Sequence, residues 1–172
     1  MEVPPRPAPL PPERQRQVAV IGSSGAELGS ELAGLAEEVG RLLAGAGVTL
    51  VCGGLTGVME AACRGAAEAD GVAIGIVPGN SVGEANPYCT HVVATGIGHA
   101  RNLAVVSSGD AVIAIGGEWG TLSEIGFARA IGRTVVALRG WTLEGRERME
   151  GAPGILLADS ARDAVDLALG AC

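Results

Sequence analysis

The sequence predicts an α/β fold: an open, doubly wound (Rossmann-like) parallel sheet of about six to seven strands with helices on both faces. Short apolar runs alternate with Ala- and Leu-rich stretches of helical spacing along most of the chain. Uninterrupted apolar runs are typical of strands that are covered on both faces, as in a parallel sheet. Glycine follows several of these runs, at the sheet edge where such folds bind ligands (Gly22, Gly53, Gly79 and Gly116).

The first half of the chain alternates three strands with two helices. Short apolar runs predict strands at residues 17–21, 48–52 and 72–77. Residues 27–44 predict a helix, because apolar side chains recur every three or four positions on one face (Leu28, Leu32, Leu35, Val39, Leu42 and Leu43). Residues 57–69 predict a second helix. Residues 80–89 have no clear period and predict a loop.

The second half continues this alternation. Apolar runs predict strands at residues 91–94, 111–115, 134–138 and 155–157. Helices are predicted between them and at the end, at residues 98–107, 121–131 and 160–169. The run at 111–115 is apolar throughout and ends in two glycines, as expected of a buried central strand.

Length and composition predict the domain organisation. The 172 residues, of which 48% are hydrophobic, suit one domain with a substantial core. Residues 1–16 contain six of the nine prolines, and proline lacks the amide donor that helices and sheets require. We therefore predict a disordered, Pro-rich tail at residues 1–16 and a single Rossmann-like nucleotide-binding domain at residues 17–172.

The charged residues exclude several classes of protein. All twelve basic residues are arginine. Without lysine the chain has no ε-amine for Schiff-base chemistry, for a pyridoxal-phosphate enzyme or for a phosphate loop of the GxxxxGK[ST] type. The formal net charge of −7 would repel a nucleic-acid backbone, so we expect no nucleic-acid partner.

The cysteines and the hydropathy pattern argue against metal sites and membrane segments. None of the four cysteines forms a C-x₂-C or C-x₄-C pair, and the two histidines do not complete a ligand set (Cys52, Cys63, Cys89 and Cys172; His91 and His99). We therefore expect no metal site and no resident cofactor. The chain lacks a signal-peptide-like apolar run at its start and any membrane-spanning run. We predict a cytoplasmic protein with reduced thiols and no membrane contact.

The segment from residue 114 to residue 124 is the strongest candidate for a ligand site. There a buried strand runs into a glycine-rich turn, which also contains Glu118, and a helix is predicted to open at about Gly120 and Thr121. Free amides at a helix start, together with the helix dipole, bind anions. Glycines in the turn let the main chain approach a phosphate, and the Thr121 hydroxyl can cap the helix or bind the anion (Gly116, Gly117 and Gly120). Glu124 could instead form a capping box with the Thr121 amide.

Arg101 is the second candidate. It lies in an otherwise apolar stretch just after a predicted strand. It could pair with Glu124 or face a ligand phosphate, and the alternative is an exposed arginine on a helix surface.

The turns after the first two strands are further candidates. Gly53 and Gly54 follow the second strand, and Gly22 and Ser23 follow the first. Tight packing of strand against helix is the alternative explanation for the Gly53–Gly54 turn. NAD is disfavoured, because the first turn is not G-x-G-x-x-G and the acid expected about 20 residues further on is missing. The serines of the first turn lack a nearby His/Asp framework, which disfavours a serine hydrolase.

Together these segments resemble the LONELY GUY (LOG) superfamily. The resemblance rests on stretches spread over residues 17–140, including Arg101-Asn102 and a segment similar to the family's PGGxGTxxE signature (50–54, 57–59, 75–78, 101–102 and 116–124). Within the superfamily the sequence looks most like the small branch that includes molybdenum-cofactor carrier proteins and relatives of the DNA-processing protein DprA. The acidic balance disfavours a DNA-handling role.

The resemblance implies a function and roles for individual residues. LOG enzymes hydrolyse the N-glycosidic bond of nucleoside 5′-monophosphates. Arg101 and Glu124 match their catalytic pair, and their phosphate loop is matched by four residues (Gly116, Gly117, Gly120 and Thr121). A carboxylate beside the ribose can stabilise the positive charge that develops during glycoside cleavage. The leading hypothesis is therefore a nucleoside 5′-monophosphate phosphoribohydrolase.

Two departures from the LOG pattern support an alternative. Ile115 replaces the signature proline, and Asn102 replaces the usual lysine after the arginine. The carrier branch keeps the phosphate loop but binds a pterin phosphate without turnover. The alternative is thus a non-catalytic carrier of the molybdenum cofactor or of another phosphorylated small molecule. The resemblance also implies a homodimer.

Overall fold

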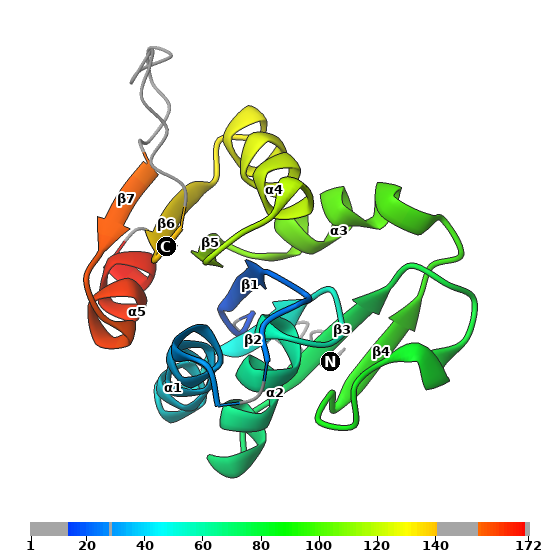
Figure 1. Ribbon diagram of the computed structural model, residues 1–172, viewed down its shortest axis with the longest axis horizontal. Coiled ribbons are helices and arrows are strands. Elements are labelled where there is room, and N and C mark those ends of the chain that lie inside the picture. Colours follow the sequence, from blue (N-terminus) through cyan, green and yellow to red (C-terminus); the bar gives the residue numbers. More distant parts are fainter. Residues whose placement is uncertain (1–13, 28, 141–154, 171–172) are drawn as a thin grey trace, which may run out of the picture.

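A computed structural model describes residues 14–27, 29–140 and 155–170. Most of the predicted Pro-rich tail, together with Cys172, lies outside the described residues. The strands and helices alternate along the chain (Figure 1). The strands are β1 (Gln17–Gly22), β2 (Thr49–Cys52), β3 (Ala73–Val77), β4 (His91–Ala94), β5 (Ala111–Ile115), β6 (Thr134–Leu138) and β7 (Ile155–Ala158). The helices are α1 (Glu31–Gly45), α2 (Val58–Glu68), α3 (Arg101–Ser108), α4 (Trp119–Ala130) and α5 (Ala161–Gly170), with two short 3-10 helices, η1 (Val82–Glu84) and η2 (Gly98–Ala100).

The strands form one parallel sheet in the order β4-β3-β2-β1-β5-β6-β7. β1 pairs with β2 on one side and with β5 on the other, where Val18 lies opposite Ala111. The chain therefore builds the sheet outward from β1 in one direction and then, from β5, in the other. This doubly wound topology confirms the predicted fold class. Its switch point, where such sheets bind ligands, lies between β1 and β5.

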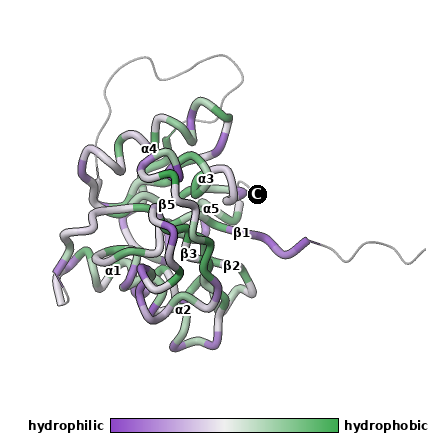
Figure 2. Tube along the Cα trace, turned by 90° about the vertical axis from the view of Figure 1, so that its right-hand side faces the viewer, coloured by the Kyte–Doolittle hydropathy of each residue, from purple (hydrophilic) through white to green (hydrophobic). Residues whose placement is uncertain are grey.

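Helices cover both faces of the sheet. α1, α2 and α5 lie on one face, and α3 and α4 lie on the other (Figure 1). The strand side chains alternate between two hydrophobic cores: Val18 and Val20 of β1 join the core under α1, α2 and α5, whereas Ala19 and Ile21 join the other. Figure 2 shows the hydrophobic strands inside this shell. No helix in the described residues is both long and apolar enough to cross a membrane.

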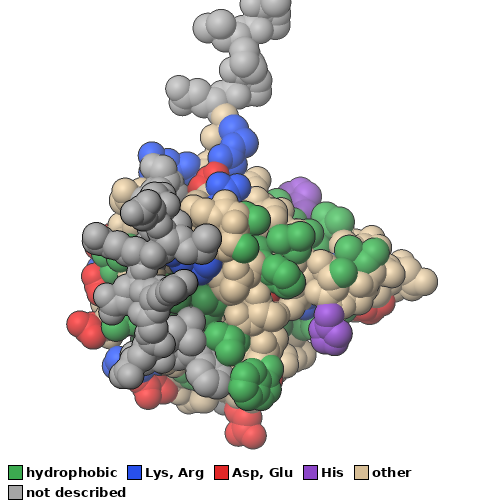
Figure 3. All heavy atoms as spheres, turned by 90° about the horizontal axis from the view of Figure 1, so that it is seen from above, with side chains coloured by type: hydrophobic (Ala, Val, Ile, Leu, Met, Phe, Trp, Pro, Cys, Tyr) green, Lys and Arg blue, Asp and Glu red, His purple; other side chains and the backbone are tan. Residues whose placement is uncertain are grey.

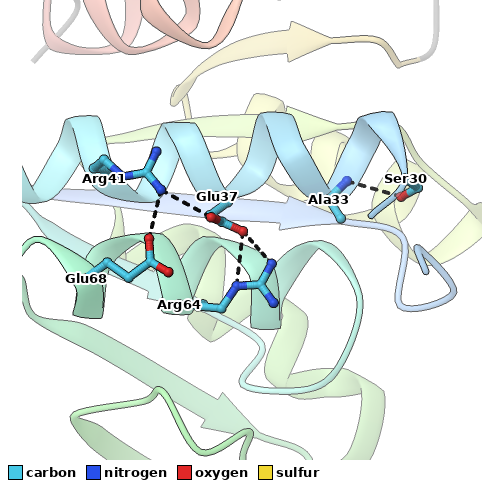
Figure 4. Close-up of polar contacts among 6 residues, drawn as sticks. All are labelled: Ser30, Ala33, Glu37, Arg41, Arg64 and Glu68. Atoms are coloured by element: carbon cyan, nitrogen blue, oxygen red, sulfur yellow. Dashed lines mark hydrogen bonds and ion pairs between the residues drawn. The ribbon is translucent and has the colours of Figure 1, made fainter. Parts of the chain in front are cut away.

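Helices α1 and α2 pack closely because glycine lies on each at the contact. A Cβ at Gly40 would lie 1.9 Å from the carbonyl oxygen of Ala62, and one at Gly65 would lie 1.9 Å from that of Glu37. Ion pairs join the same helices (Figure 4). Across the contact, Arg41 donates to Glu68 at 2.8 Å and Arg64 Nε donates to Glu37 at 3.0 Å. Arg41 also donates to Glu37 of its own helix at 3.1 Å.

Several predicted boundaries were wrong. α1 begins at Glu31, four residues later than predicted, because Gly29 has a φ of +85° and the Ser30 side chain accepts a hydrogen bond from the Ala33 amide as the helix cap. α4 begins at Trp119, two residues earlier than predicted, with Glu118 as its N-cap.

Two other segments differ in detail from the prediction. The predicted helix at 98–107 is a 3-10 turn, η2, followed by α3. The predicted loop at 80–89 contains the short helix η1, which is closed by a capping box between Ser81 and Glu84.

Candidate functional site

The turns after the three central strands meet at the carboxyl edge of the sheet. The turn after β1 contacts β5, since a Cβ at Gly22 would lie 2.4 Å from the carbonyl oxygen of Ile115. It also contacts the turn after β2, because the Ser23 carbonyl accepts a hydrogen bond from the Val58 amide at 3.0 Å. A Cβ at Gly57 would lie 2.3 Å from the same carbonyl oxygen. The structure thus gathers three of the predicted turns around the switch point.

The turn after β5 requires glycine. Gly116 and Gly117 have φ angles of +61° and +153°, which side chains other than glycine rarely adopt. A Cβ at Gly116 would also lie 2.7 Å from Leu32 Cδ1, and the Gly116 amide donates to the Leu138 carbonyl at 3.0 Å. The turn therefore lies between α1 and β6, and α4 follows it directly. That helix begins without a side-chain cap.

Ser23 and Glu118 join the two turns that flank the switch point. The Ser23 hydroxyl donates a hydrogen bond to Glu118 Oε1 at 2.7 Å, and it accepts one from the Gly25 amide at 3.2 Å. The Glu118 side chain therefore reaches across from the β5 turn to the β1 turn instead of capping α4. The predicted ligand-binding residues Gly22, Ser23 and Glu118 thus lie together.

Arg101 and Glu124 form a buried ion pair between α3 and α4. Arg101 Nη1 donates to Glu124 Oε1 at 3.4 Å and to Asn102 Oδ1 at 2.5 Å. Arg101 and Glu124 are 7% exposed as whole residues, so the alternative of an exposed surface arginine was wrong. The alternative of a Glu124 capping box was also wrong, because α4 starts at Trp119 and Glu124 lies beyond its first turn.

Burial changes the protonation of Glu124. Loss of solvent raises the pKa of this carboxyl group to about 7, although the charge of Arg101 pulls it in the opposite direction. Near neutral pH, Glu124 can therefore either hold or release a proton. A carboxyl group in this state can act as a general acid or as a charge partner.

Gly53 and Asn102 shape the surroundings of Arg101. A Cβ at Gly53 would lie 2.8 Å from Arg101 Nη2, so only glycine leaves room here for the guanidinium group. The buried Nε of Arg101 has no hydrogen-bond partner among the described residues. Asn102 was not among the predicted site residues. Its position directly after Arg101 was the available signal, but its contact with the guanidinium group depends on the packed structure.

The other predicted residues differ in their surroundings. Thr121 is buried in the first turn of α4, one turn before Glu124. Gly120 is exposed, and no atom lies within 4 Å of the position of an added Cβ. Gly54 is not brought to the switch point: an added Cβ would meet Val77 and Gly75 of β3. Gly54 thus packs tightly against a strand, whereas the alternative had been packing of a strand against a helix.

This chain is similar in sequence and in fold to known proteins. The model of the SLOG cluster4 family matches residues 15–165. An uncharacterized protein of Archaeoglobus fulgidus is 41% identical over 123 residues, which cover 72% of this chain and 80% of the relative.

Two solved structures are similar over nearly their whole length. The molybdenum cofactor binding protein of the phototrophic bacterium Rippkaea orientalis has a TM-score of 0.81 and 29% identity, covering 92% of this chain and 98% of that one. The molybdenum cofactor carrier protein of Chlamydomonas reinhardtii has a TM-score of 0.76 and 26% identity, covering 91% and 98%. The resemblance that the sequence predicted is thereby confirmed.

Proposed function

This chain belongs to the SLOG cluster4 family, and from that premise we propose that it binds a phosphorylated small molecule at the switch point without converting it. The ligand we propose is the molybdenum cofactor, a pterin phosphate, which this protein would carry. The similarity to two proteins described as binding or carrying that cofactor supports the choice of ligand, because it extends over 98% of each of their chains.

The observation that carries the proposal is the turn from β5 into α4. Gly116 and Gly117 place the main chain in conformations that other residues rarely adopt, and α4 then starts without a side-chain cap. The first backbone N–H groups of a helix have no acceptor within the helix, and together with the helix dipole they attract anions. Gly120 in the first turn leaves open space beside the helix. A phosphate group fits these donors and this space.

Arg101 supports the same location for the ligand. A buried guanidinium N–H without an acceptor is unfavourable, and an oxygen of a bound ligand would satisfy it. Glu124 pairs with the same guanidinium group, and its protonation sets how much negative charge lies beside the ligand. We therefore place the phosphate at the turn and the remainder of the ligand toward Arg101.

An acidic substitution at Gly120 tests the location. Gly120→Asp should weaken binding of the molybdenum cofactor at least about tenfold, equal to about 1.4 kcal/mol, because it places a negative charge beside the phosphate. It should fold normally, since an added Cβ at this exposed position meets no atom within 4 Å and an acid in the first helical turn is favourable. Binding is measured by anaerobic fluorescence titration, and folding by thermal denaturation.

Two matched variants complete this experiment. Gly126→Asp adds the same charge to the same helix at another open, exposed position and should leave affinity unchanged. Gly120→Ala adds no charge and should also bind normally. Equal affinity of Gly120→Asp and Gly126→Asp for the cofactor would contradict a phosphate site at this turn.

Nucleotide hydrolysis is the second candidate function, and the Arg101–Glu124 pair favours it. A carboxyl group with a pKa of about 7 could protonate a departing base or, when ionised, stabilise the positive ribose. Incubation with AMP, CMP, GMP and UMP, followed by chromatography for free base, tests this activity. Base release by the wild type that is lost in Glu124→Ala would favour the hydrolase over the carrier.

We also propose that the protein forms a homodimer through α3 and α4. Large apolar side chains are exposed on these helices and at the end of α4: Leu103, Phe127 and Ile131. Figure 3 views this side of the molecule, where hydrophobic side chains gather. An apolar surface of this kind is typical of a subunit interface. Light scattering during size-exclusion chromatography should give a molecular mass of two chains for the wild type. Phe127→Asp should reduce this mass to that of a single chain.

A further inference from the structure

Three cysteines that are far apart in the sequence come together in the fold. Cys52 is the last residue of β2, Cys63 lies in α2, and Cys89 lies just before β4. The Cys52 and Cys63 sulfurs are 3.4 Å apart, and the Cys63 and Cys89 sulfurs are 3.8 Å apart. All three sulfurs lie within 4.8 Å of one another, and all three cysteines are free thiols. We call this group the thiol cluster.

Neighbouring residues make room for the thiol cluster and form a hydrogen bond with it. Gly75 of β3 lies beside Cys89, where an added Cβ would be 2.7 Å from the sulfur. A side chain at position 75 would therefore displace Cys89. The Gly54 amide donates a hydrogen bond to the Cys52 sulfur at 3.3 Å. The thiolate is the form of cysteine that binds metals, so each thiol would release its proton when an ion binds.

The separations of the sulfurs suit a shared metal ion. A metal–sulfur bond is about 2.3 Å long, which places two sulfurs on one ion about 3.8–4.0 Å apart. The Cys63–Cys89 separation of 3.8 Å falls in this range, and the Cys52–Cys63 separation of 3.4 Å would need to widen by a few tenths of an ångström. Buried cysteines also occur as small apolar core residues, but that role does not require three sulfurs to converge.

The donor set narrows the choice of ion. In the described residues the ligating side chains gathered here are the three cysteines, with Cys52 and Cys63 buried and Cys89 half-buried. Sulfur-only coordination excludes hard cations such as Mg²⁺ and Ca²⁺, which take oxygen ligands. Soft thiolates select Cu(I) and Zn²⁺. We propose that Cys52, Cys63 and Cys89 form a binding site for a thiophilic d¹⁰ metal ion such as Cu(I), separate from the phosphate site at the switch point.

Metal titration of the full chain tests this site. Protein that has been reduced and stripped with a chelator is titrated anaerobically with Cu(I), and separately with Zn²⁺, against a chromogenic chelator. We expect one equivalent of Cu(I) or Zn²⁺ to bind, to raise the melting temperature and to protect three thiols from alkylation. Mg²⁺ should do none of these.

Single cysteine variants assign the ligands. Cys89→Ala changes a half-buried position and should fold. It removes a direct ligand, so it should weaken metal binding by more than the roughly tenfold to hundredfold cost of losing an outer-shell partner. Cys63→Ala should do the same, and thermal denaturation without metal verifies its folding. Cys172→Ala, which removes the fourth cysteine, is the matched control and should bind like the wild type.

Three results would overturn the proposal. The first is the failure of the wild type to bind either ion at one equivalent. The second is binding that persists in both Cys63→Ala and Cys89→Ala, or that disappears in Cys172→Ala. The third is recovery of a Cys52–Cys63 disulfide from protein alkylated at lysis, which would identify these two residues as a redox pair.

Discussion

The Arg101 guanidinium group lies 3.4 Å from Glu124 Oε1, and each side chain is only 9% exposed. Removing two opposite charges from water costs more than their attraction returns unless further contacts compensate. Here the compensation is partial, since Asn102 accepts one guanidinium hydrogen bond while Arg101 Nε has no partner among the described residues. This balance explains why burial outweighs Arg101 and raises the pKa of Glu124. The pair is therefore suited to exchanging a proton or accepting a ligand.

The raised pKa of Glu124 predicts a pH-dependent stability. Below pH 4.5 the carboxyl group is neutral in both folded and unfolded chains, and above pH 7 it is ionised in both. Between these values only the unfolded chain loses the proton, so the folded state loses about 3 kcal/mol as the pH rises.

Urea denaturation of the wild type and Glu124→Gln, at pH values from 4.5 to 8.5, measures this effect. The difference in unfolding free energy, wild type minus variant, should fall up to pH 7 and stay level above it. A difference that does not change with pH would show that Glu124 titrates normally.

Removing Arg101 should extend this pH range upward. Arg101 is the charge that lowers the pKa of Glu124, so in Arg101→Gln the pKa should rise above 7. The additional destabilisation of this variant should then grow above pH 7, by about 1.4 kcal/mol for each unit of further pKa shift. Denaturation at pH 6, 7, 8 and 9 measures it.

Arg139→Gln is the control for this variant, because Arg139 pairs with Glu31 at the surface. Its effect should be small and should not grow with pH. Identical pH profiles of the two arginine variants would contradict the buried pair.

The contact between α1 and α2 predicts opposite effects at two glycines of α1. Gly40→Ala should destabilise the protein by about 1–3 kcal/mol, because its Cβ would lie 1.9 Å from the Ala62 carbonyl oxygen and the helices would have to move apart. Gly34→Ala, at an open position of the same helix, should stabilise it by about 0.5–1 kcal/mol through helix propensity. Equilibrium urea unfolding measures the free energy of unfolding of both variants. An increase in this free energy for Gly40→Ala would mean that the helices are not in contact there.

Local sequence patterns predicted the elements well, and they were least accurate at the helix starts. β4, β5 and β6 begin and end where the apolar runs do. The start of α1 was misplaced because the apolar period continues upstream of Ser30, whose side chain nevertheless forms the cap. The start of α4 was misplaced because Glu118, the N-cap residue, gives no side-chain capping signal and turns instead to Ser23.

The sequence by itself determined the alternation of strands and helices, the glycine turns at the strand ends and the pairing of Arg101 and Glu124 as candidates. The elements and turns depend on residues within a few positions of one another, whereas Arg101 and Glu124, 23 positions apart, were paired because both match one family's motifs. Only the tertiary structure decided that Arg101 and Glu124 are buried together, that Gly54 packs against β3, and that Cys52, Cys63 and Cys89 meet. Burial and contact depend on which distant segments cover a side chain, and the order of strands in the sheet sets that covering.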